Sequence, residues 1–377
     1  MNPRADARPR PHICFVAPAI WPVLSDSRSI ESVGGAEVQQ CMLARAFAAA
    51  GYRVSVVTMD YGQQDGVDID GITVWRAHAP DAGLPGLRFL HPRLTSLWAA
   101  MKRADAQIYY QRSSSMLTAL VVRFCDVFSR RSVFAAAHDA DFDPALPLIR
   151  FRRDKWLFRH GLAHVDAVVA QSAAQARACR QHFGRQARVI PSCHAPPSGA
   201  GADRNGHVLW VATLRQWKRP GLFLELARRL PRLRFCMVGG PDDPALYERL
   251  QREAASLPNL EFQGFVPYAA IDARFDQARV FVNTSEAEGF PNTFLQAWAR
   301  GIPEVSFLDS GIRRAGDIDA MTRMVERLMS DDIAWRAASK ECSARFAARH
   351  TPAAALDAYG RLFLDWCENR VGWYEPA

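Results

Sequence analysis

The sequence predicts an α/β protein made of two doubly wound domains that face each other across a cleft. Its 377 residues suit two domains of about 150 to 200 residues each. In both halves, short β-branched runs alternate with helical patterns, which is typical of mostly parallel sheets. A stretch rich in Pro, Gly and polar residues at 191–206 separates the two series. We expect an N-terminal domain at 1–200, a C-terminal domain at 205–350, and a final helix at about 352–377 that packs back on the first domain.

The N-terminal domain is predicted to begin with the apolar strand ICFVAPA and to alternate strands with helices from there on. Its first long helix ends at Gly51, because glycine readily takes the left-handed conformation found at helix ends. The predicted strands are 13–19, 53–59, 72–77, 107–112, 132–137 and 167–172, and the predicted helices are 36–50, 94–102, 115–128 and 147–164.

The C-terminal domain repeats this alternation, with strands at 207–214, 234–240, 260–266 and 280–285 and helices at 221–230, 244–256 and 269–276. A further strand, GIPEVSF, carries Glu304 at a position expected to be buried and apolar. Helices follow from about 318–329, and the amphipathic segment 351–373 forms the last one. Ligands bind outside the carboxyl ends of the strands in such sheets, so the site is expected there.

Composition and charge restrict the class of protein. Hydrophobic residues make up 49% and charged residues 23% of the chain, as in soluble globular proteins rather than disordered ones. The net charge of +8 lies in residues 1–200, which hold 24 Lys and Arg against 16 Asp and Glu, while the remainder holds 23 against 23. Such an excess suits nucleic acid, anionic lipid, a phosphorylated substrate, or simply solvated surface.

The cysteines and apolar segments indicate a cytoplasmic protein. Eight cysteines show no CxxC spacing, which argues against a zinc ribbon or a disulfide framework and favours reduced, buried thiols. The first residues are polar and lack the apolar region of a signal peptide. No run of about 18 apolar residues is present to span a membrane.

The segment from Glu286 to Pro303, EAEGFPNTFLQAWARGIP, combines a strand end with a helix start. Pro291 suits the first helical position and Gly301 closes the helix. The free N-H groups at the helix start form an anion site, with Glu288 just before it and Gln296 on the second turn. A carboxylate and an amide beside a phosphate site suit sugar and ribose hydroxyls, although a loop acid and a surface glutamine explain the pattern equally well.

Two other loops of the C-terminal domain carry candidate residues. TLRQWKRP at 213–220 places Arg215 and Lys218 between a strand and a helix, where two cations can neutralise a diphosphate without a metal. A solvated basic turn is the alternative. The turn QGFVP contains Gly264, Phe265 and Val266.

These motifs resemble the GT-B glycosyltransferases, two Rossmann-like domains, and among them the retaining family 4 (group 1), which is marked by a Glu, seven residues and a second Glu. The resemblance runs from about Ile13 to Trp366, and EGFPNTFLQAWARGIP is its most specific part. It implies that Glu288 contacts the transferred sugar, that Gln296, in place of the second Glu, holds the ribose, and that Lys218 and Arg215 hold the diphosphate. It also assigns the base to the backbone of Gly264, Phe265 and Val266, and the rest of the donor site to Gly289, Phe290, Pro291, Asn292 and Thr293.

In the first domain, the resemblance assigns Gly34 and Gly35 to a glycine loop before a helix, where backbone N-H groups approach a phosphate or the acceptor. It assigns His138 to the donor sugar, with Asp139 orienting that histidine or contacting the acceptor. The run HDADFD at 138–143 fails as an EF-hand. Counted from Asp139, the sixth position of the loop is Pro144 where glycine is needed, and the twelfth is Arg150 where a glutamate is needed. We therefore predict no metal site.

The stretch from Arg150 to Arg159 interleaves five cations with aromatic and apolar side chains. A cationic helix with aromatics can lie on an anionic membrane, and an internally packed helix with snorkelling arginines is the alternative. No nucleic-acid motif accompanies the charge.

The resemblance thus implies a retaining, metal-independent hexosyl-type glycosyltransferase (EC 2.4) that needs no cofactor and takes a UDP- or GDP-sugar as donor. Glu288, His138 and Lys218 are its expected catalytic residues. The expected acceptor is a glycan or lipid-linked glycan of polysaccharide biosynthesis, used in the cytoplasm or at the inner membrane face. The alternative is a degenerate, non-catalytic GT-B protein that binds a nucleotide sugar or a partner, favoured by Gln296, Glu304 and the short segment after Ser306.

Overall fold

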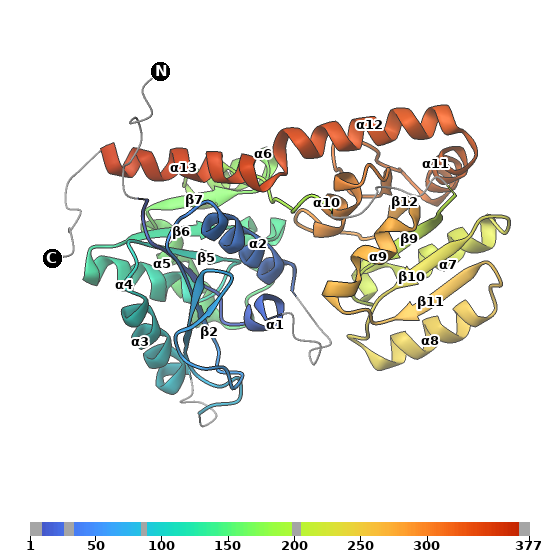
Figure 1. Cartoon of the computed structure of the whole chain (residues 1–377). Helices are drawn as coiled ribbons and strands as arrows, with labels where there is room; N and C mark the ends of the chain where they lie inside the picture. Colours follow the sequence, from blue (N-terminus) through green and yellow to red (C-terminus); the bar gives the residue numbers. More distant parts are fainter. Residues whose placement is uncertain (1–9, 26–33, 84–88, 198–204, 369–377) are drawn as a thin grey trace, which may run out of the picture. The chain divides into compact units, whose positions relative to one another are not determined.

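A computed structural model of the chain describes residues 10–25, 34–83, 89–197 and 205–368 (Figure 1). The chain divides into two compact units. The first unit comprises the residues up to Pro191 and those from Ala355 on. The second unit runs from Ser192 to Ala354. A short stretch that ends at Gly35 belongs to the second unit instead of the first. Each unit is built on a largely parallel sheet, which confirms the predicted α/β class with two doubly wound domains.

The sheet of the N-terminal domain has the strand order β3-β4-β2-β1-β5-β6-β7-β8. The strands pair in parallel except β3 with β4, a hairpin that was not predicted and that turns at Asp70 and Gly71, both with positive φ. The strands are β1 Ile13–Val16, β2 Val54–Thr58, β3 Val67–Ile69, β4 Ile72–Arg76, β5 Ile108–Arg112, β6 Arg131–Ala135, β7 Ala167–Ala170 and β8 Arg188–Val189. The α-helices between them are α1 Trp21–Leu24, α2 Gly35–Ala49, α3 Thr95–Ala104, α4 Leu117–Phe128, α5 Arg152–His164 and α6 Ala173–Phe183.

The helix predicted at 147–164 is shorter than expected, because α5 begins only at Arg152. Leu146 takes a positive φ of 49°, and Phe151 is extended, so the chain between them cannot be helical. This loop buries Ile149 in the core under α5, and that burial outweighs the helical pattern of the sequence.

The sheet of the C-terminal domain has the order β11-β10-β9-β12-β13, and all of its neighbouring strands are parallel. Its strands are β9 His207–Val211, β10 Phe235–Val238, β11 Leu260–Gly264, β12 Ala278–Asn283 and β13 Glu304–Ser306. The chain moves outward from β9 through β10 to β11, then returns to the other side of β9 with β12. The direction of winding therefore reverses between β9 and β12, which makes their carboxyl ends the topological switch point.

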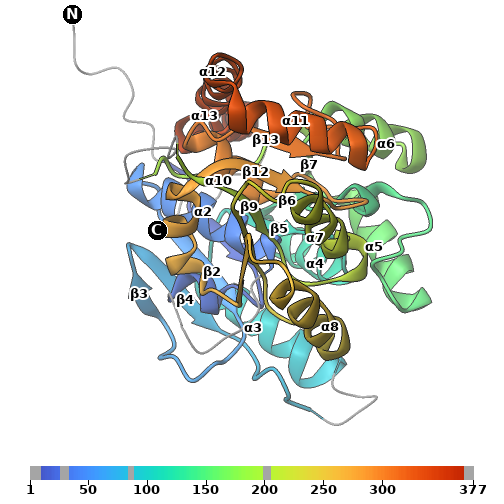
Figure 2. The same ribbon diagram turned by 90° about the vertical axis from the view of Figure 1, so that its right-hand side faces the viewer.

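Helices cover both faces of this sheet (Figure 2). One core holds side chains of α7 Pro220–Arg229, α8 Pro244–Ala255 and α11 Ile318–Ser330, and the other holds those of α9 Asp272–Asp276 and α10 Asn292–Ala299. The long helix α12 Asp332–Arg349 contributes to both cores.

The last helix, α13 Pro352–Glu368, packs on the N-terminal domain. Tyr359 and Phe363 lie about one turn apart, and their rings are 6.0 Å and 5.9 Å from the ring of Phe47 in α2. These apolar contacts fix the end of the chain to the first domain.

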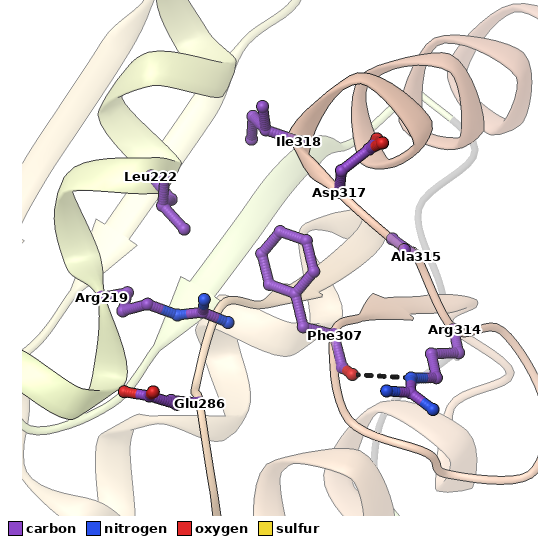
Figure 3. A pocket seen from close by; sticks show the side chains of 9 residues that line it. Arg219, Leu222, Glu286, Phe307, Arg314, Ala315, Asp317 and Ile318 are labelled. Carbon is purple, nitrogen blue, oxygen red and sulfur yellow. Dashed lines mark hydrogen bonds between the residues drawn. The ribbon is translucent and has the colours of Figure 1, made fainter.

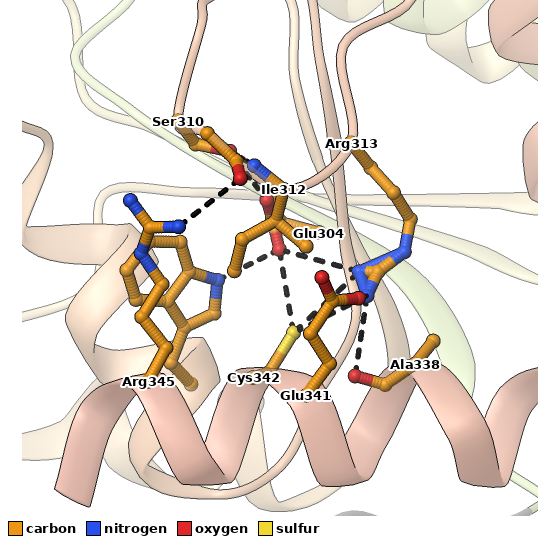
Figure 4. A network of polar contacts seen from close by, with 10 residues as sticks. Glu304, Ser310, Ile312, Arg313, Ala338, Glu341, Cys342 and Arg345 are labelled. Carbon is orange, nitrogen blue, oxygen red and sulfur yellow. Dashed lines mark hydrogen bonds and ion pairs between the residues drawn. The ribbon is translucent and has the colours of Figure 1, made fainter. Parts of the chain in front are cut away.

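Glu304, the charged residue expected in an apolar strand, is fully buried at the start of β13 and is well bonded (Figure 4). Its Oε2 accepts a hydrogen bond from the indole of Trp298 at 2.7 Å, and its Oε1 accepts one from the hydroxyl of Ser310 at 2.7 Å. The guanidinium of Arg313 lies 3.9 Å from Oε2 and binds Glu341 of α12 at 2.9 Å. Glu304 therefore ties β13, α10 and the loop after β13 together.

The described part of the chain contains no helix that is both long and apolar enough to cross a membrane. Seven cysteines are described as buried side chains, and none of these seven forms a disulfide.

Substitution of Gly161 in α5 tests how closely this helix packs on α4. A Cβ atom there would lie 2.6 Å from the backbone nitrogen of Ala119, so Gly161→Ala should lower the free energy of unfolding by about 1 to 3 kcal/mol. Gly360 of α13 belongs to the same domain and has open space around it, and Gly360→Ala should raise that free energy by about 0.5 to 1 kcal/mol. Urea unfolding followed by circular dichroism measures both, and equal stabilities would contradict the close approach of α4 and α5.

The Glu304 network predicts a second stability effect. Glu304→Leu removes the acceptor from three buried donors, which belong to Trp298, Ser310 and Cys342, and leaves Arg313 half-paired. This change should cost about 3 to 5 kcal/mol. Glu341→Gln alters the exposed end of the same network and should cost less than about 1 kcal/mol. Thermal unfolding compares the two, and a Glu304→Leu variant as stable as the original chain would show that the network contributes nothing.

Candidate functional site

Lys218 and Glu288 form an ion pair at the switch point of the C-terminal sheet. Lys218 ends the short 3-10 helix η3 Gln216–Lys218 after β9, and Glu288 lies in the loop after β12. The Lys218 Nζ atom is 2.6 Å from Glu288 Oε1, and each side chain is only 13% exposed. Burial lowers the pKa of Lys218, and the neighbouring carboxylate opposes that shift. Two predicted residues are thus in direct contact.

The carboxylate of Glu288 is held by one of its two oxygens. Asn283 Nδ2 donates to Oε1 at 3.1 Å, and Ser285 Oγ donates to the same atom at 2.5 Å. Among the described residues, Asn283, Ser285 and Lys218 are the polar partners of this carboxylate, and all three contact Oε1. Oε2 therefore remains available to a hydroxyl group of a ligand, while Oε1 fixes the orientation of the side chain.

Hydrogen bonds also join the two loops that carry this pair. The hydroxyl of Thr284 donates to the carbonyl of Lys218 at 2.7 Å and accepts from the indole of Trp210 at 2.9 Å. Arg219 donates through Nε to the carbonyl of Thr284 at 2.9 Å. No sequence signal marked Trp210, Thr284 or Arg219, because their roles depend on which strands are neighbours in space.

A pocket of about 390 Å³ borders this region at the ends of β9, β12 and β13 (Figure 3). Arg219 and Glu286, which are close neighbours of the ion pair in sequence, form one side of it, and the start of α11 forms another. The Arg219 guanidinium lies 4.7 Å from the ring centre of Phe307. The lining is a mixture of charged and apolar groups, as is usual for small-molecule sites.

Helix α10 lies beside the site, as the helical pattern predicts, but begins one residue later. Pro291 is the extended N-cap residue, with ψ of 127°, and Asn292 is the first helical residue. The predicted donor residues Gly289 to Thr293 therefore form the link from Glu288 to the first turn. Phe290 anchors that link, since its ring stacks on His350 at 5.2 Å. Gly301, with φ of 69°, follows the end of the helix as expected.

Gln296 lies on the buried side of α10 and is 3% exposed. Its Nε2 atom is a buried donor without a hydrogen-bond partner among the described residues. Leaving such a group unsatisfied costs about 1 to 3 kcal/mol. An acceptor oxygen supplied by a ligand would remove that cost.

The Gly264–Val266 turn follows β11 and is shaped by glycines. Gly264 has φ of 66°, and its carbonyl accepts from the backbone of Gly239 at 2.8 Å. A Cβ atom on Gly240 would lie 3.0 Å from the Phe265 ring, so that ring packs directly on the backbone. In the sequence, the Gly-Gly pair in RFCMVGG was the feature that could have indicated this close packing of Phe265 on the backbone.

Arg215 lies near the ion pair but has an acidic partner of its own. Its guanidinium is 2.9 Å from Asp242 and faces Trp217, whose ring centre is 4.3 Å from the Lys218 Nζ atom. The ring of Trp217 is therefore a neighbour of both cations, Arg215 and Lys218.

In the N-terminal domain, His138 is the N-cap residue of the 3-10 helix η2 Asp139–Phe142. Its Nδ1 atom accepts from the backbone of Ala140 at 3.0 Å, so the neutral ring carries its proton on Nε2. The buried Asp141 completes this cap by accepting from the backbones of His138 and Ala137 at 3.0 Å and 2.6 Å. Asp139 was expected to orient His138 or to contact the acceptor, and its carboxylate accepts a hydrogen bond from Gln175 at 2.8 Å.

The glycine loop of the first domain is described only at its end. Gly34 precedes α2, Gly35 is its first residue, and both are exposed. Glu37 lies in the first turn, where burial raises the pKa of its carboxyl group and the charge of Arg112 opposes that rise. Across the described ranges, no group of three or more His, Cys, Asp or Glu side chains could hold a metal ion.

Comparisons with known proteins support one class of protein. Residues 33–194 match a family model described as "Glycosyltransferase Family 4", and residues 205–334 match one described as "Glycosyl transferases group 1". A search of curated protein sequences gives no match.

Solved structures share the fold over nearly the whole chain. Sucrose-phosphate synthase from Thermosynechococcus elongatus superposes with a TM-score of 0.76 at 17% identity, covering 94% of this chain and 99% of the synthase. A glycosyltransferase from Rickettsia africae gives 0.70 at 12% identity, covering 96% and 100%. Starch synthase IV from Arabidopsis thaliana gives 0.66 at 11% identity, covering 95% and 99%. With glycosyltransferase models matching both domains and this fold shared over its length, the chain belongs to the GT-B glycosyltransferases.

Proposed function

We propose that this protein transfers a hexose-type sugar from a nucleoside-diphosphate sugar to an acceptor hydroxyl, with retention of configuration and without a metal ion. The observation that carries the proposal is the Lys218–Glu288 pair at the switch point, with Glu288 Oε2 left available. The cation can neutralise phosphate charge, and the free oxygen can accept a hydrogen bond from a sugar hydroxyl. Both groups are partly desolvated, so each interaction is stronger than it would be in water.

The remaining donor contacts follow from the strand ends. Phe265 and the backbone of Gly264 and Val266 would hold the base, next to Gly239 and Gly240, which follow β10. Arg215 and Lys218 would face the diphosphate. The orphaned Nε2 atom of Gln296 would donate to a ribose hydroxyl, which satisfies that buried group.

In the proposed reaction, the bond from the anomeric carbon to the leaving phosphate oxygen breaks. The acceptor oxygen bonds to that carbon on the same face, and the acceptor proton passes to the departing diphosphate. Lys218 stabilises the charge that develops on the diphosphate. Following the family resemblance, we also assign His138, with its proton on Nε2, to the donor sugar, and Gly34, Gly35 and Asp139 to the acceptor.

Three solved structures with this fold contain a nucleoside diphosphate, which supports a nucleotide sugar as the donor. Starch synthase IV was solved with ADP, and both TarM of S. aureus and a pneumococcal O-GlcNAc transferase were solved with UDP. We propose a UDP- or GDP-sugar as the donor and a glycan or lipid-linked glycan of polysaccharide biosynthesis as the acceptor. A lipid-linked acceptor would be met at a membrane surface, in a cytoplasmic or peripheral setting.

A non-catalytic GT-B protein is the second candidate, favoured by the segment after Ser306. Where the family resemblance implies a further strand, Arg314 forms only an isolated bridge with Ser306. Glu304, in contrast, no longer favours this candidate, because all of its contacts stabilise the domain.

Replacement of Glu288 tests the proposed site. Glu288→Gln removes the charge and disturbs the Lys218 contact, and we expect kcat/KM to fall by about 10² to 10³. Nucleotide release from a panel of UDP-, GDP- and ADP-sugars gives the rates, and calorimetry gives donor affinity. Glu248→Gln, on the exposed side of α8, is the matched control and should keep full activity. Unchanged turnover in Glu288→Gln would refute the site, and tight donor binding without turnover in the original chain would favour the binding protein.

Asn283 and Ser285 are predicted to act as positioning residues through Glu288. Ser285→Ala and Asn283→Leu each remove one hydrogen bond from the Oε1 atom of Glu288. We expect kcat to fall by up to about 10²-fold, the cost of a small misplacement of a positioned group. The same changes made in a Glu288→Ala background should have almost no further effect, since the group that they orient is gone. Additive losses in that double-mutant cycle would mean that Asn283 and Ser285 act only through stability. Ser256→Ala, at the end of α8, serves as the control.

A further inference from the structure

One segment of the N-terminal domain concentrates positive charge. Residues 144–164 hold five Lys and Arg side chains and one acid, Asp154. Their excess of four (5 − 1) is half of the excess of eight (24 − 16) that residues 1–200 carry. Exposed apolar side chains lie in the same segment. We call this surface the α5 patch and define it by Leu148, Arg150, Phe151, Arg152, Trp156 and Arg159.

Helix α5 has a clear buried side and a clear outer side. Phe158 and Leu162 are fully buried, and Gly161 lies against the backbone of α4. Trp156 is two positions from Phe158, so it points about 160° away from it around a helix of 3.6 residues per turn. It is 63% exposed, an unusual state for a tryptophan. The ring of His160 stacks on it at 5.7 Å and continues the outer side.

The loop before α5 adds two further apolar side chains in ordered positions. Leu148 is 54% exposed and Phe151 is 55% exposed. The loop is fastened to the helix, because Lys155 Nζ donates to the carbonyl of Ala145 at 2.5 Å and Arg159 Nη2 donates to that of Pro144 at 2.6 Å. The exposure of Leu148 and Phe151 is therefore a property of a fixed loop.

Charge pairing in this segment differs from that in the C-terminal domain. There, Arg279 and Arg300 bind aspartates, and Arg228 and Arg229 bind glutamates of their own or neighbouring helices. In the α5 segment the single acid, Asp154, forms its ion pair with Arg153 at 2.8 Å. The cations of the patch thus greatly outnumber the local acids.

We propose that the α5 patch docks on an anionic lipid surface. Cations attract lipid phosphates, and exposed Trp, Phe and Leu side chains enter the interface between headgroups and acyl chains. A soluble polyanion would match the charge but would give no role to the three apolar side chains. The inference rests on the proposed function only in naming where a lipid-linked acceptor would be met, since vesicle binding needs no sugar transfer.

Vesicle sedimentation of the full chain tests this proposal. The original protein should sediment with vesicles of phosphatidylcholine and phosphatidylglycerol, should stay soluble with phosphatidylcholine alone, and should be released by salt. Arg150→Ser with Arg152→Ser should weaken binding by roughly 25-fold, at about fivefold per surface cation. Phe151→Ser with Trp156→Ser should weaken binding to the vesicles but leave binding to heparin, a soluble polyanion, unchanged.

Matched changes on the other domain serve as controls. Arg249→Ser with Arg252→Ser removes two exposed cations from α8, and Ile333→Ser removes a side chain that is 81% exposed on α12. Both should bind vesicles like the original chain, and circular dichroism should show all variants folded. Absence of binding to anionic vesicles, or equal binding by the patch variants, would overturn the proposal. Vesicle binding that is no tighter than heparin binding and does not depend on Phe151 and Trp156 would assign the patch to a soluble polyanion instead.

Discussion

The ion pair of Lys218 and Glu288 is the contact on which the proposed chemistry depends. Each charge is largely removed from water, so neither is stable there without the other or a ligand that replaces it. The strand order makes the pair possible, because only the reversal between β9 and β12 brings their two loops together. A diphosphate can take over the role of the carboxylate toward Lys218. In the proposed function, Glu288 would then keep the hydrogen bonds from Asn283 and Ser285 and would gain one from a sugar hydroxyl.

The C-terminal domain contains a second buried, compensated carboxylate, and this one has a structural role. Glu304 is also a buried carboxylate, but indole, hydroxyl and guanidinium groups of the protein surround it. Glu288, by comparison, has one oxygen saturated and one available. Saturation marks the carboxylate that stabilises the fold, and the open oxygen marks the one that can act on a ligand. Burial alone would not separate these two residues.

The fold class, the strand positions and the loops of Lys218 and Glu288 could be predicted from sequence, because hydrophobic periodicity and strand-end position are local properties. The contacts of Asn283, Ser285 and Thr284 could not, since they depend on which oxygen of Glu288 faces which loop. The start of α5 was missed because burial of Ile149 overrode a helical pattern. Asp141 was missed as the residue that completes the His138 cap, because the alternating acids at 139, 141 and 143 look alike until the 3-10 helix turns one of them inward.

The donor site in the C-terminal domain does not explain why the excess of positive charge lies in the N-terminal domain. An excess of arginine alone is compatible with plain solvation, since long side chains can keep their charges in water while their stems cover apolar surface. On α5, however, Trp156 is itself uncovered, and the arginines beside it do not shield it. A soluble surface gains nothing from an exposed indole among cations, whereas a membrane interface stabilises both groups at once. The combination of apolar and cationic groups therefore distinguishes a lipid surface from solvent.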